Sequence, residues 1–190
     1  MQTIDSAVSK EKFDTEVSVF LANEAMHRKR GILLLKHEFP DVIFIFSAVN
    51  LKPASIVFAV KINFNDYDLS APSVRFIDPF TWEPMIVAPV LLYRKIVYPD
   101  KPAEIQHLTQ KDTNGLPFIC IPGIREYHEH PAHTGDSWLL HRNKCGEGTL
   151  GFIVEKLFDY GISAINSYQF QIQLQAPQAL VGVDLNLIPE

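Results

Sequence analysis

The first thirty residues follow a helical pattern of apolar positions. Residues at spacings of three and four form one face of an amphipathic helix predicted over 9–30, and this face comprises Phe13, Val17, Phe20 and Leu21. Ser6 is the expected N-cap of this helix, and Gly31 is expected to end it. The chain therefore opens with one helix that buries an aromatic and aliphatic face.

Four short apolar runs with strand character follow the helix. They span 32–35, 42–49, 56–62 and 74–77. Turn residues separate them, and the connections are too short for the crossover that parallel neighbours require. The pattern predicts a four-stranded antiparallel meander.

The second half of the chain is less regular. An insertion over about 78–113 is rich in proline and has one apolar run, 86–97, interpreted as a strand or hairpin. A short strand at 118–121 leads into a histidine-rich loop over about 121–147. A helix is predicted over 149–160, residues 162–168 fit either more helix or a loop, and 171–175 alternate as a strand does.

Composition places the chain among globular proteins. Of its 190 residues, 47% are hydrophobic and 21% charged, so a disordered, collagen-like or coiled-coil chain is excluded and a single domain over 1–190 is expected. The formal net charge of -5 gives no footprint for nucleic acid or an anionic membrane. Because the start lacks signal-peptide features and no apolar stretch could span a bilayer, we expect a cytoplasmic protein.

The histidine-rich loop is the strongest candidate for chemistry. It holds four of the seven histidines, flanked by two cysteines. Zinc binds imidazole and thiolate, commonly with four ligands. The candidate ligands are Cys120, His128, His130, His133, His141 and Cys145, with Asp136 and Glu129 as oxygen alternatives or acceptors behind them. A histidine cluster without metal is the alternative interpretation.

Cys120 has three interpretations. It is a nucleophile, a zinc ligand or an inert core residue, since apolar residues flank it. As a nucleophile it needs a pKa near neutrality, which His128 or Arg125 could provide if either lies close. Tyr127 and Trp138 are interpreted as packing around the site.

The order of these features resembles the ubiquitin-conjugating enzyme (UBC) family. After the helix and the meander, the chain has Phe58-Ala-Val-Lys-Ile-Asn-Phe-Asn-Asp-Tyr67 and then Ser70-Ala-Pro-Ser-Val-Arg-Phe76, similar to the family's strand and proline-rich turn. Asn114-Gly-Leu-Pro-Phe-Ile-Cys120-Ile resembles the segment whose cysteine carries the ubiquitin thioester. Trp138 and the helix after it resemble the family's downstream tryptophan and helix. The resemblance covers about residues 9–160.

The chain departs from the family pattern at the active site. The family's His-Pro-Asn tripeptide is not visible before Cys120, and both the segment before Asn114 and the loop after Cys120 are longer than usual. These features resemble divergent bacterial relatives encoded beside ubiquitin-like proteins and activating enzymes, some described as metal-binding. The resemblance implies an α+β UBC-like fold and a role in a ubiquitin-like conjugation pathway.

Three functions compete on the sequence. The first is a carrier in which Cys120 accepts a ubiquitin-like C-terminus from its activating enzyme, with Asn114, a backbone N–H or a loop histidine stabilising the oxyanion. The second is an inactive adaptor of that pathway in which zinc is held by Cys120, His128, His130 and His133. The third is a zinc hydrolase that uses Glu126 or Glu129 as base.

Overall fold

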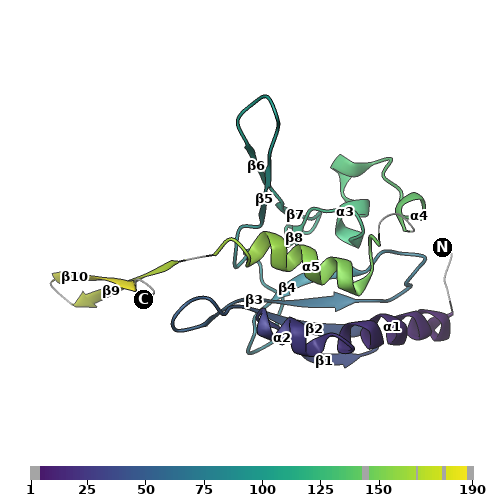
Figure 1. Cartoon of the computed structure of the whole chain (residues 1–190), viewed down its shortest axis with the longest axis horizontal. Helices are drawn as coiled ribbons and strands as arrows, with labels where there is room; N and C mark the ends of the chain where they lie inside the picture. The colour runs from purple at the N-terminus through teal and green to yellow at the C-terminus, as the bar shows by residue number, and fades with distance from the viewer. Residues whose placement is uncertain (1–4, 143–145, 166, 177–178, 188–190) are drawn as a thin grey trace.

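The computed structural model describes residues 5–142, 146–165, 167–176 and 179–187. A four-stranded antiparallel sheet packs against helices α1 (Ser6–Leu21) and α5 (Leu150–Gly161), which contact each other (Figure 1). The expected α+β class, with an N-terminal helix, a four-stranded meander and a later helix, is confirmed. None of the helices in the described ranges combines the length and low polarity that crossing a bilayer demands.

The expected N-terminal helix is divided into two helices. α1 ends at Leu21, and α2 (Glu24–Lys29) starts after a break at 22–23. The Asp5 side chain, and not that of Ser6, caps α1, because Asp5 Oδ1 accepts a hydrogen bond from the Ala7 N–H at 2.9 Å. The single helix over 9–30 and the Ser6 cap were therefore wrong. Across this break His27 of α2 stacks on Phe20 of α1, and both side chains are buried.

The sheet is the predicted meander. Its strands run in the order β1 (Ile32–Glu38), β2 (Asp41–Ala48), β3 (Ser55–Asn63) and β4 (Ser73–Ile77). β1 has one neighbour in the sheet, and its register with β2 shifts between Leu34 and Lys36. Lys36 forms an ion pair with Glu38 at 2.8 Å.

The two faces of the sheet form separate cores. The face toward α1 and α5 holds a cluster of aromatic rings that includes Phe44, Phe46, Phe58 and Phe76. Phe20 of α1 meets Phe44 edge-on, with ring centroids 5.0 Å apart. The alternate residues form a smaller cluster on the opposite face: Ile43, Ile45, Ala59 and Ile77. The period-two pattern of the strands accounts for this division.

The proline-rich segment forms two small hairpins. β5 (Tyr93–Ile96) pairs with β6 (Glu104–His107) in a hairpin that projects from the sheet and helices (Figure 1). β7 (Thr109–Lys111) pairs with β8 (Pro117–Ile119). The apolar run over 86–97 is a strand only from residue 93 on. Ile86 and Val87 are exposed, because no neighbouring strand covers them in the described structure.

Three short helices lead from β8 to α5. They are α3 (Arg125–Glu129), the 3-10 helix η1 (Pro131–His133) and α4 (Trp138–His141). The helix predicted over 149–160 is α5, and the Thr149 hydroxyl oxygen caps it by accepting a hydrogen bond from the Phe152 N–H. Residues 162–164 form a turn, in agreement with the loop interpretation. β9 (Tyr168–Ala176) and β10 (Ala179–Leu187) pair with each other.

Candidate functional site

Cys120 lies directly after β8 and is only half buried. Its backbone N–H donates to the carbonyl oxygen of Leu108 at 2.6 Å, which fixes the chain at this point. Phe118 and Ile119 before it are fully buried, whereas Cys120 retains access to solvent. Burial raises the pKa of the Cys120 thiol, so a thiolate at neutral pH requires a nearby base.

His133 provides a base in contact with this thiol. Its Nε2 atom lies 3.2 Å from Cys120 Sγ. The sequence named His128 and Arg125 as residues that would lower the pKa of Cys120 if they lay close, without fixing their distance. In the structure His133 is the residue in contact with the thiol. Thirteen positions separate the two residues in the chain, and the turns through α3 and η1 bring them together.

The other side of the His133 ring faces Asp136. Nδ1 of His133 lies 3.9 Å from Asp136 Oδ2. The same Oδ2 atom accepts a hydrogen bond from the Tyr127 hydroxyl at 2.8 Å, and the Tyr127 ring stacks on His133 with centroids 3.9 Å apart. Burial, together with the hydrogen bond to Asp136, raises the pKa of Tyr127 to about 12, so the phenol stays protonated.

Together these residues have the composition of a nucleophilic site. In such a site Cys120 would be the nucleophile: the Nε2 atom of His133 is in position to take its proton, and Asp136 lies near the other imidazole nitrogen. The 3.9 Å separation between His133 and Asp136 is longer than a hydrogen bond. Catalytic hydrogen bonds are often long before a substrate binds.

His128 connects two backbone segments. Its Nδ1 atom donates to the carbonyl oxygen of Asp136 at 2.6 Å, and its Nε2 atom accepts from the Gly123 N–H at 3.0 Å. These bonds require the neutral ring with the proton on Nδ1. Burial lowers the pKa of His128 and favours that neutral form. Both nitrogens are engaged, so His128 offers no lone pair to a metal ion in this arrangement.

The other predicted zinc ligands are spread over the loop. His130 Nδ1 accepts from the Ala132 N–H and caps η1, and His141 Nδ1 lies 3.0 Å from Glu147 Oε2. Cys145 lies outside the described residues. Among the residues that are described, no three Cys, His, Asp or Glu side chains are placed to hold one ion. The set is not assembled for zinc here, and zinc binding stays a prediction.

Asn114 lies at the turn between β7 and β8. Its N–H donates to Asp112 Oδ1 in that turn, whereas Cys120 follows the other end of β8. With Arg75 and His130, Asn114 lines a small polar pocket to which Cys120 does not contribute. This placement does not support the predicted role of Asn114 as an oxyanion donor.

Two charged residues of α3 have structural partners. Glu126 is buried, accepts hydrogen bonds from the Ser73 hydroxyl and the Val74 N–H, and lies 3.3 Å from Arg75 Nε. Arg125 donates from Nε to the carbonyl oxygen of Ala71 at 3.0 Å. Glu126 is therefore not placed as the base of a hydrolase, while Glu129 is exposed. These contacts attach α3 to β4.

Trp138 attaches the histidine-rich loop to the segment between β3 and β4. It is buried, and its Nε1 atom donates to the carbonyl oxygen of Asp68 at 2.9 Å. Gly148 has φ +78°, and a Cβ atom there would lie 2.3 Å from Cη2 of Trp138. The packing role predicted for Trp138 agrees with these contacts. Tyr127, in contrast, takes part in the site, a role that its sequence position did not reveal.

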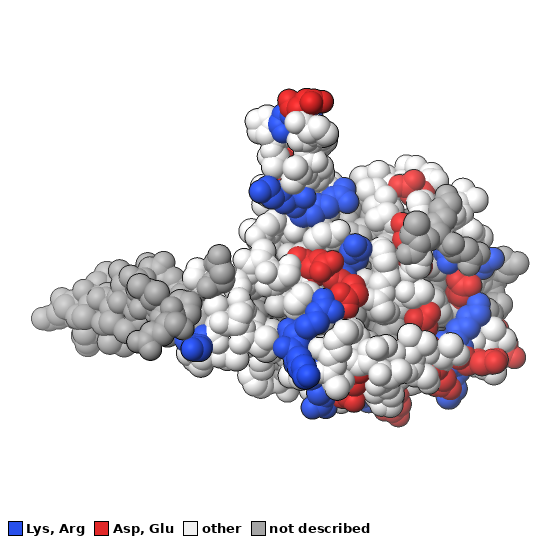
Figure 2. Space-filling view, in the orientation of Figure 1, with Lys and Arg blue, Asp and Glu red and all other residues white. Residues whose placement is uncertain are grey.

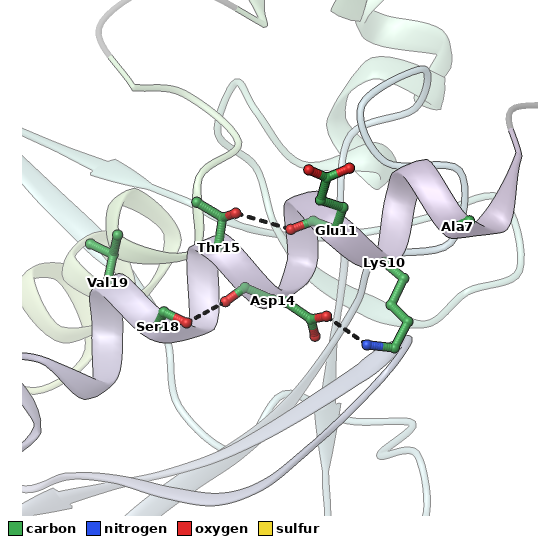
Figure 3. Close-up of a pocket in the computed structure, with 7 residues that line it drawn as sticks. All are labelled: Ala7, Lys10, Glu11, Asp14, Thr15, Ser18 and Val19. Carbon is green, nitrogen blue, oxygen red and sulfur yellow. Dashed lines mark hydrogen bonds and ion pairs between the residues drawn. The ribbon is translucent and has the colours of Figure 1, made fainter.

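The exposed face of α1 has an open hollow, and most of its polar side chains are engaged within the helix. Lys10 forms an ion pair with Asp14, and the Thr15 and Ser18 hydroxyls donate to carbonyl oxygens one turn earlier (Figure 3). Over the described residues that face the viewer in Figure 2, Lys and Arg are interspersed with Asp and Glu. Neither observation marks a second reactive centre on these surfaces.

Comparison with known proteins places these residues in a family. The model of the Y4jH-like family (Y4jH family) matches residues 4–165, which include the sheet, Cys120, His133, Asp136 and α5. The chain is also similar to the uncharacterized protein y4jH of Sinorhizobium fredii (strain NBRC 101917 / NGR234). The two are 40% identical over 205 residues, which cover 100% of this chain and 98% of that protein.

Proposed function

The chain belongs to the Y4jH family, and we propose that it is a ubiquitin-conjugating-like carrier of a bacterial ubiquitin-like pathway. In this proposal Cys120 accepts the activated C-terminus of a ubiquitin-like protein as a thioester. The order of elements supports it: an N-terminal helix, a four-stranded meander, a cysteine after a short strand, a buried tryptophan and a helix. This is the order that the sequence resemblance to the UBC family implies.

The contact between Cys120 Sγ and His133 Nε2, at 3.2 Å, carries the proposal. A thiol whose pKa is raised by burial reacts slowly at neutral pH without a base. An imidazole at this distance removes that obstacle, and positioned proton transfer typically accelerates a reaction about 10²–10⁴-fold. The family's His-Pro-Asn tripeptide is not visible before Cys120, and in this proposal His133 of the loop supplies the acid–base group.

The proposed step is an exchange of thioesters. His133 Nε2 takes the proton of Cys120, and the Cys120 thiolate attacks the carbonyl carbon of the thioester on the activating enzyme. A new bond forms between Cys120 Sγ and that carbon, and the bond to the activating enzyme's sulfur breaks. The departing thiolate receives the proton from His133. The products are a thioester on Cys120 and a free thiol on the activating enzyme.

The proposed partners are the ubiquitin-like protein and its activating enzyme, and the proposed location is the cytoplasm. Neither nucleic acid nor a membrane takes part. In the alternative proposal the protein is an inactive adaptor in which Cys120, His130 and His133 close around zinc. His128, the fourth ligand expected from the sequence, would have to give up a backbone hydrogen bond to join them. Since a zinc-bound thiolate is a poor carrier, the two functions require the same sulfur atom.

The test is the formation of an adduct. The purified protein is mixed with ATP, the ubiquitin-like protein and the activating enzyme of the same genome, and is analysed on non-reducing gels. We expect an adduct that a thiol reductant removes and that Cys120→Ala abolishes. His107→Ala is the matched control, because His107 is exposed on β6 and outside the site.

A charged activating enzyme that transfers nothing to wild-type protein would contradict the carrier proposal. Elemental analysis of the same preparation addresses the alternative. Zinc near one equivalent in wild type that is lost in both Cys120→Ala and His133→Ala would favour the adaptor.

A further inference from the structure

Helix α3 presents two adjacent side chains to Asp136. Tyr127 reaches its carboxylate: the hydroxyl donates to Oδ2 at 2.8 Å, while the ring lies on His133 at 3.9 Å with an interplanar angle of 24°. One side chain thus contacts both His133 and Asp136. The side chain of Asp136 is 46% exposed, so this hydrogen bond restrains a carboxylate that would otherwise turn into solvent.

His128 holds the backbone of the same residue. It donates to the Asp136 carbonyl oxygen at 2.6 Å and accepts from Gly123, three positions after Cys120, at 3.0 Å. The imidazole therefore spans the loop between the segment that carries the thiol and the segment that carries His133 and Asp136. Because η1 has only three residues and the chain around it is irregular, regular secondary structure does not set this distance.

α3 is itself held firmly. The buried Glu126 carboxylate and the Arg125 guanidinium attach it to β4 and to the backbone at Ala71. Tyr127 and His128 therefore project from a helix whose own position is fixed by contacts with the sheet.

We infer that Tyr127 and His128 are positioning residues, which hold His133 and Asp136 in place against Cys120 before any substrate arrives. This inference rests on the proposed function, because it explains how His133, the base in that function, is oriented. It gives the histidine-rich loop a purpose other than metal binding: its imidazoles act as hydrogen-bonding links and as the base. A displacement of about 1 Å at a reacting group can cost up to 10²-fold in rate.

The test measures the alkylation of Cys120 by iodoacetamide from pH 5 to pH 9, followed by mass spectrometry. All proteins carry Cys145→Ser, so that one thiol reacts. Tyr127→Phe removes the hydroxyl and keeps the ring. We expect it to slow alkylation at pH 7 by about tenfold and to move the rate profile toward higher pH, because His133 is held less well against the thiol.

Two further variants and a control sharpen the result. His128→Ala removes both links and is expected to slow the reaction by about tenfold, whereas His128→Asn keeps a donor near the Nδ1 position and should lie in between. Tyr98→Phe is the matched control, since its hydroxyl also donates to a carboxylate, Glu104 at 3.0 Å, but in the β5–β6 hairpin.

The outcomes separate the two proposals. If the alkylation rate of the wild-type protein follows the titration of an isolated thiol, and His133→Ala leaves that pH profile unchanged, then His133 is not the base assigned in the proposed function. If His133→Ala changes the wild-type pH profile, but Tyr127→Phe and His128→Ala both leave it unchanged, the positioning role of Tyr127 and His128 is overturned and the base assignment stands. If His128→Ala does not fold, as judged by circular dichroism, the result for Tyr127→Phe decides, because that change preserves the shape of the ring.

Discussion

Two histidine–carboxylate pairs in this molecule have nearly the same spacing and different surroundings. His27 Nδ1 of α2 lies 3.8 Å from Glu155 Oε1 of α5, and His133 Nδ1 lies 3.9 Å from Asp136 Oδ2. Each imidazole stacks on an aromatic ring, Phe20 in one case and Tyr127 in the other. Distance to a carboxylate alone does not distinguish a structural histidine from a reactive one.

The His27–Glu155 pair differs from the His133–Asp136 pair in the residue that binds its carboxylate. Arg30 binds both oxygens of Glu155, at 2.6 and 2.7 Å, and lies over the Phe158 ring. His27 is buried, and its Nδ1 atom makes no hydrogen bond to any described residue. Burial lowers the pKa of His27, so the neutral ring is favoured. This cluster links α2 to α5 and has no nucleophile.

At His133 the third partner is a thiol. Asp136 is held by a neutral phenol, not by a guanidinium, so its negative charge remains available to an imidazolium. The opposite nitrogen of the ring faces Cys120 Sγ. The two pairs therefore differ in two respects: the carboxylate at His133 is not bound by a guanidinium, and the second nitrogen of its ring faces a thiol, as the proposed function requires.

The largest effect is expected from His133→Ala. Without the imidazole, the raised thiol pKa of Cys120 is uncompensated, and iodoacetamide alkylation at pH 7 should fall about 10²-fold. Thermal unfolding should stay within about 2 °C of wild type, because His133 is partly exposed. A variant that alkylates as fast as wild type would remove the distinction drawn between the two pairs.

For His27→Ala we expect a loss of stability without a change in the reactivity of Cys120. Loss of the buried ring from its stack on Phe20 should lower the free energy of unfolding by about 2 kcal/mol, or roughly 5 °C in Tm. Alkylation of Cys120 should not change. Differential scanning calorimetry beside His37→Ala, a variant of a surface histidine on β1, measures the first effect. Slower alkylation in His27→Ala would show that the two pairs are coupled.

A smaller effect is expected in the pH dependence of stability. Because the pKa of His27 is lowered in the folded state, the unfolded chain binds more protons at mildly acidic pH, and stability falls as pH drops from about 7 toward the folded pKa. His128 contributes in the same direction. His27→Phe keeps an aromatic stack without titration, so its loss of Tm between pH 7.5 and pH 5.5 should be smaller by about 2 °C. If wild type and His27→Phe lose the same Tm between pH 7.5 and pH 5.5, the pH dependence of stability does not come from His27.

The smallest effect is expected at a third pair. His141 Nδ1 lies 3.0 Å from Glu147 Oε2, closer than in either pair above. If the thiol and not the spacing confers reactivity, Glu147→Gln should change Cys120 alkylation less than twofold, since proton transfer to His133 does not involve it. A larger change in the alkylation assay would extend the site to His141.

The sheet and α5 could be predicted because their burial is periodic. Phe44 and Phe46 alternate with Ile43 and Ile45, and α5 has a cap, an apolar stripe and a glycine at its end. The break between α1 and α2 could not be predicted in this way. Glu24–Lys29 continue the helical pattern in type, and neither the burial of His27 nor its stack on Phe20 can be read from that pattern.

The site could be predicted only in part. The cysteine and its histidine-rich loop were identified by residue type, and His133 was among the candidates. Which histidine would meet the thiol depends on hydrogen bonds across the loop, such as that from His128 to the Asp136 backbone. Such bonds join a side chain to the main chain and leave no periodic pattern. The spacing of His133 and Asp136, three residues apart, was the available signal for their pairing.

The shape of β1 has a consequence for molecules at high concentration. An outer strand invites a strand from another copy to extend the sheet, which is a route to aggregation. In β1 the irregular register at Leu34–Lys36 interrupts the hydrogen-bonding ladder, and the charges of Lys36 and Glu38 follow at once. An incoming strand would have to bury these charges, so this edge protects the molecule against uncontrolled self-assembly.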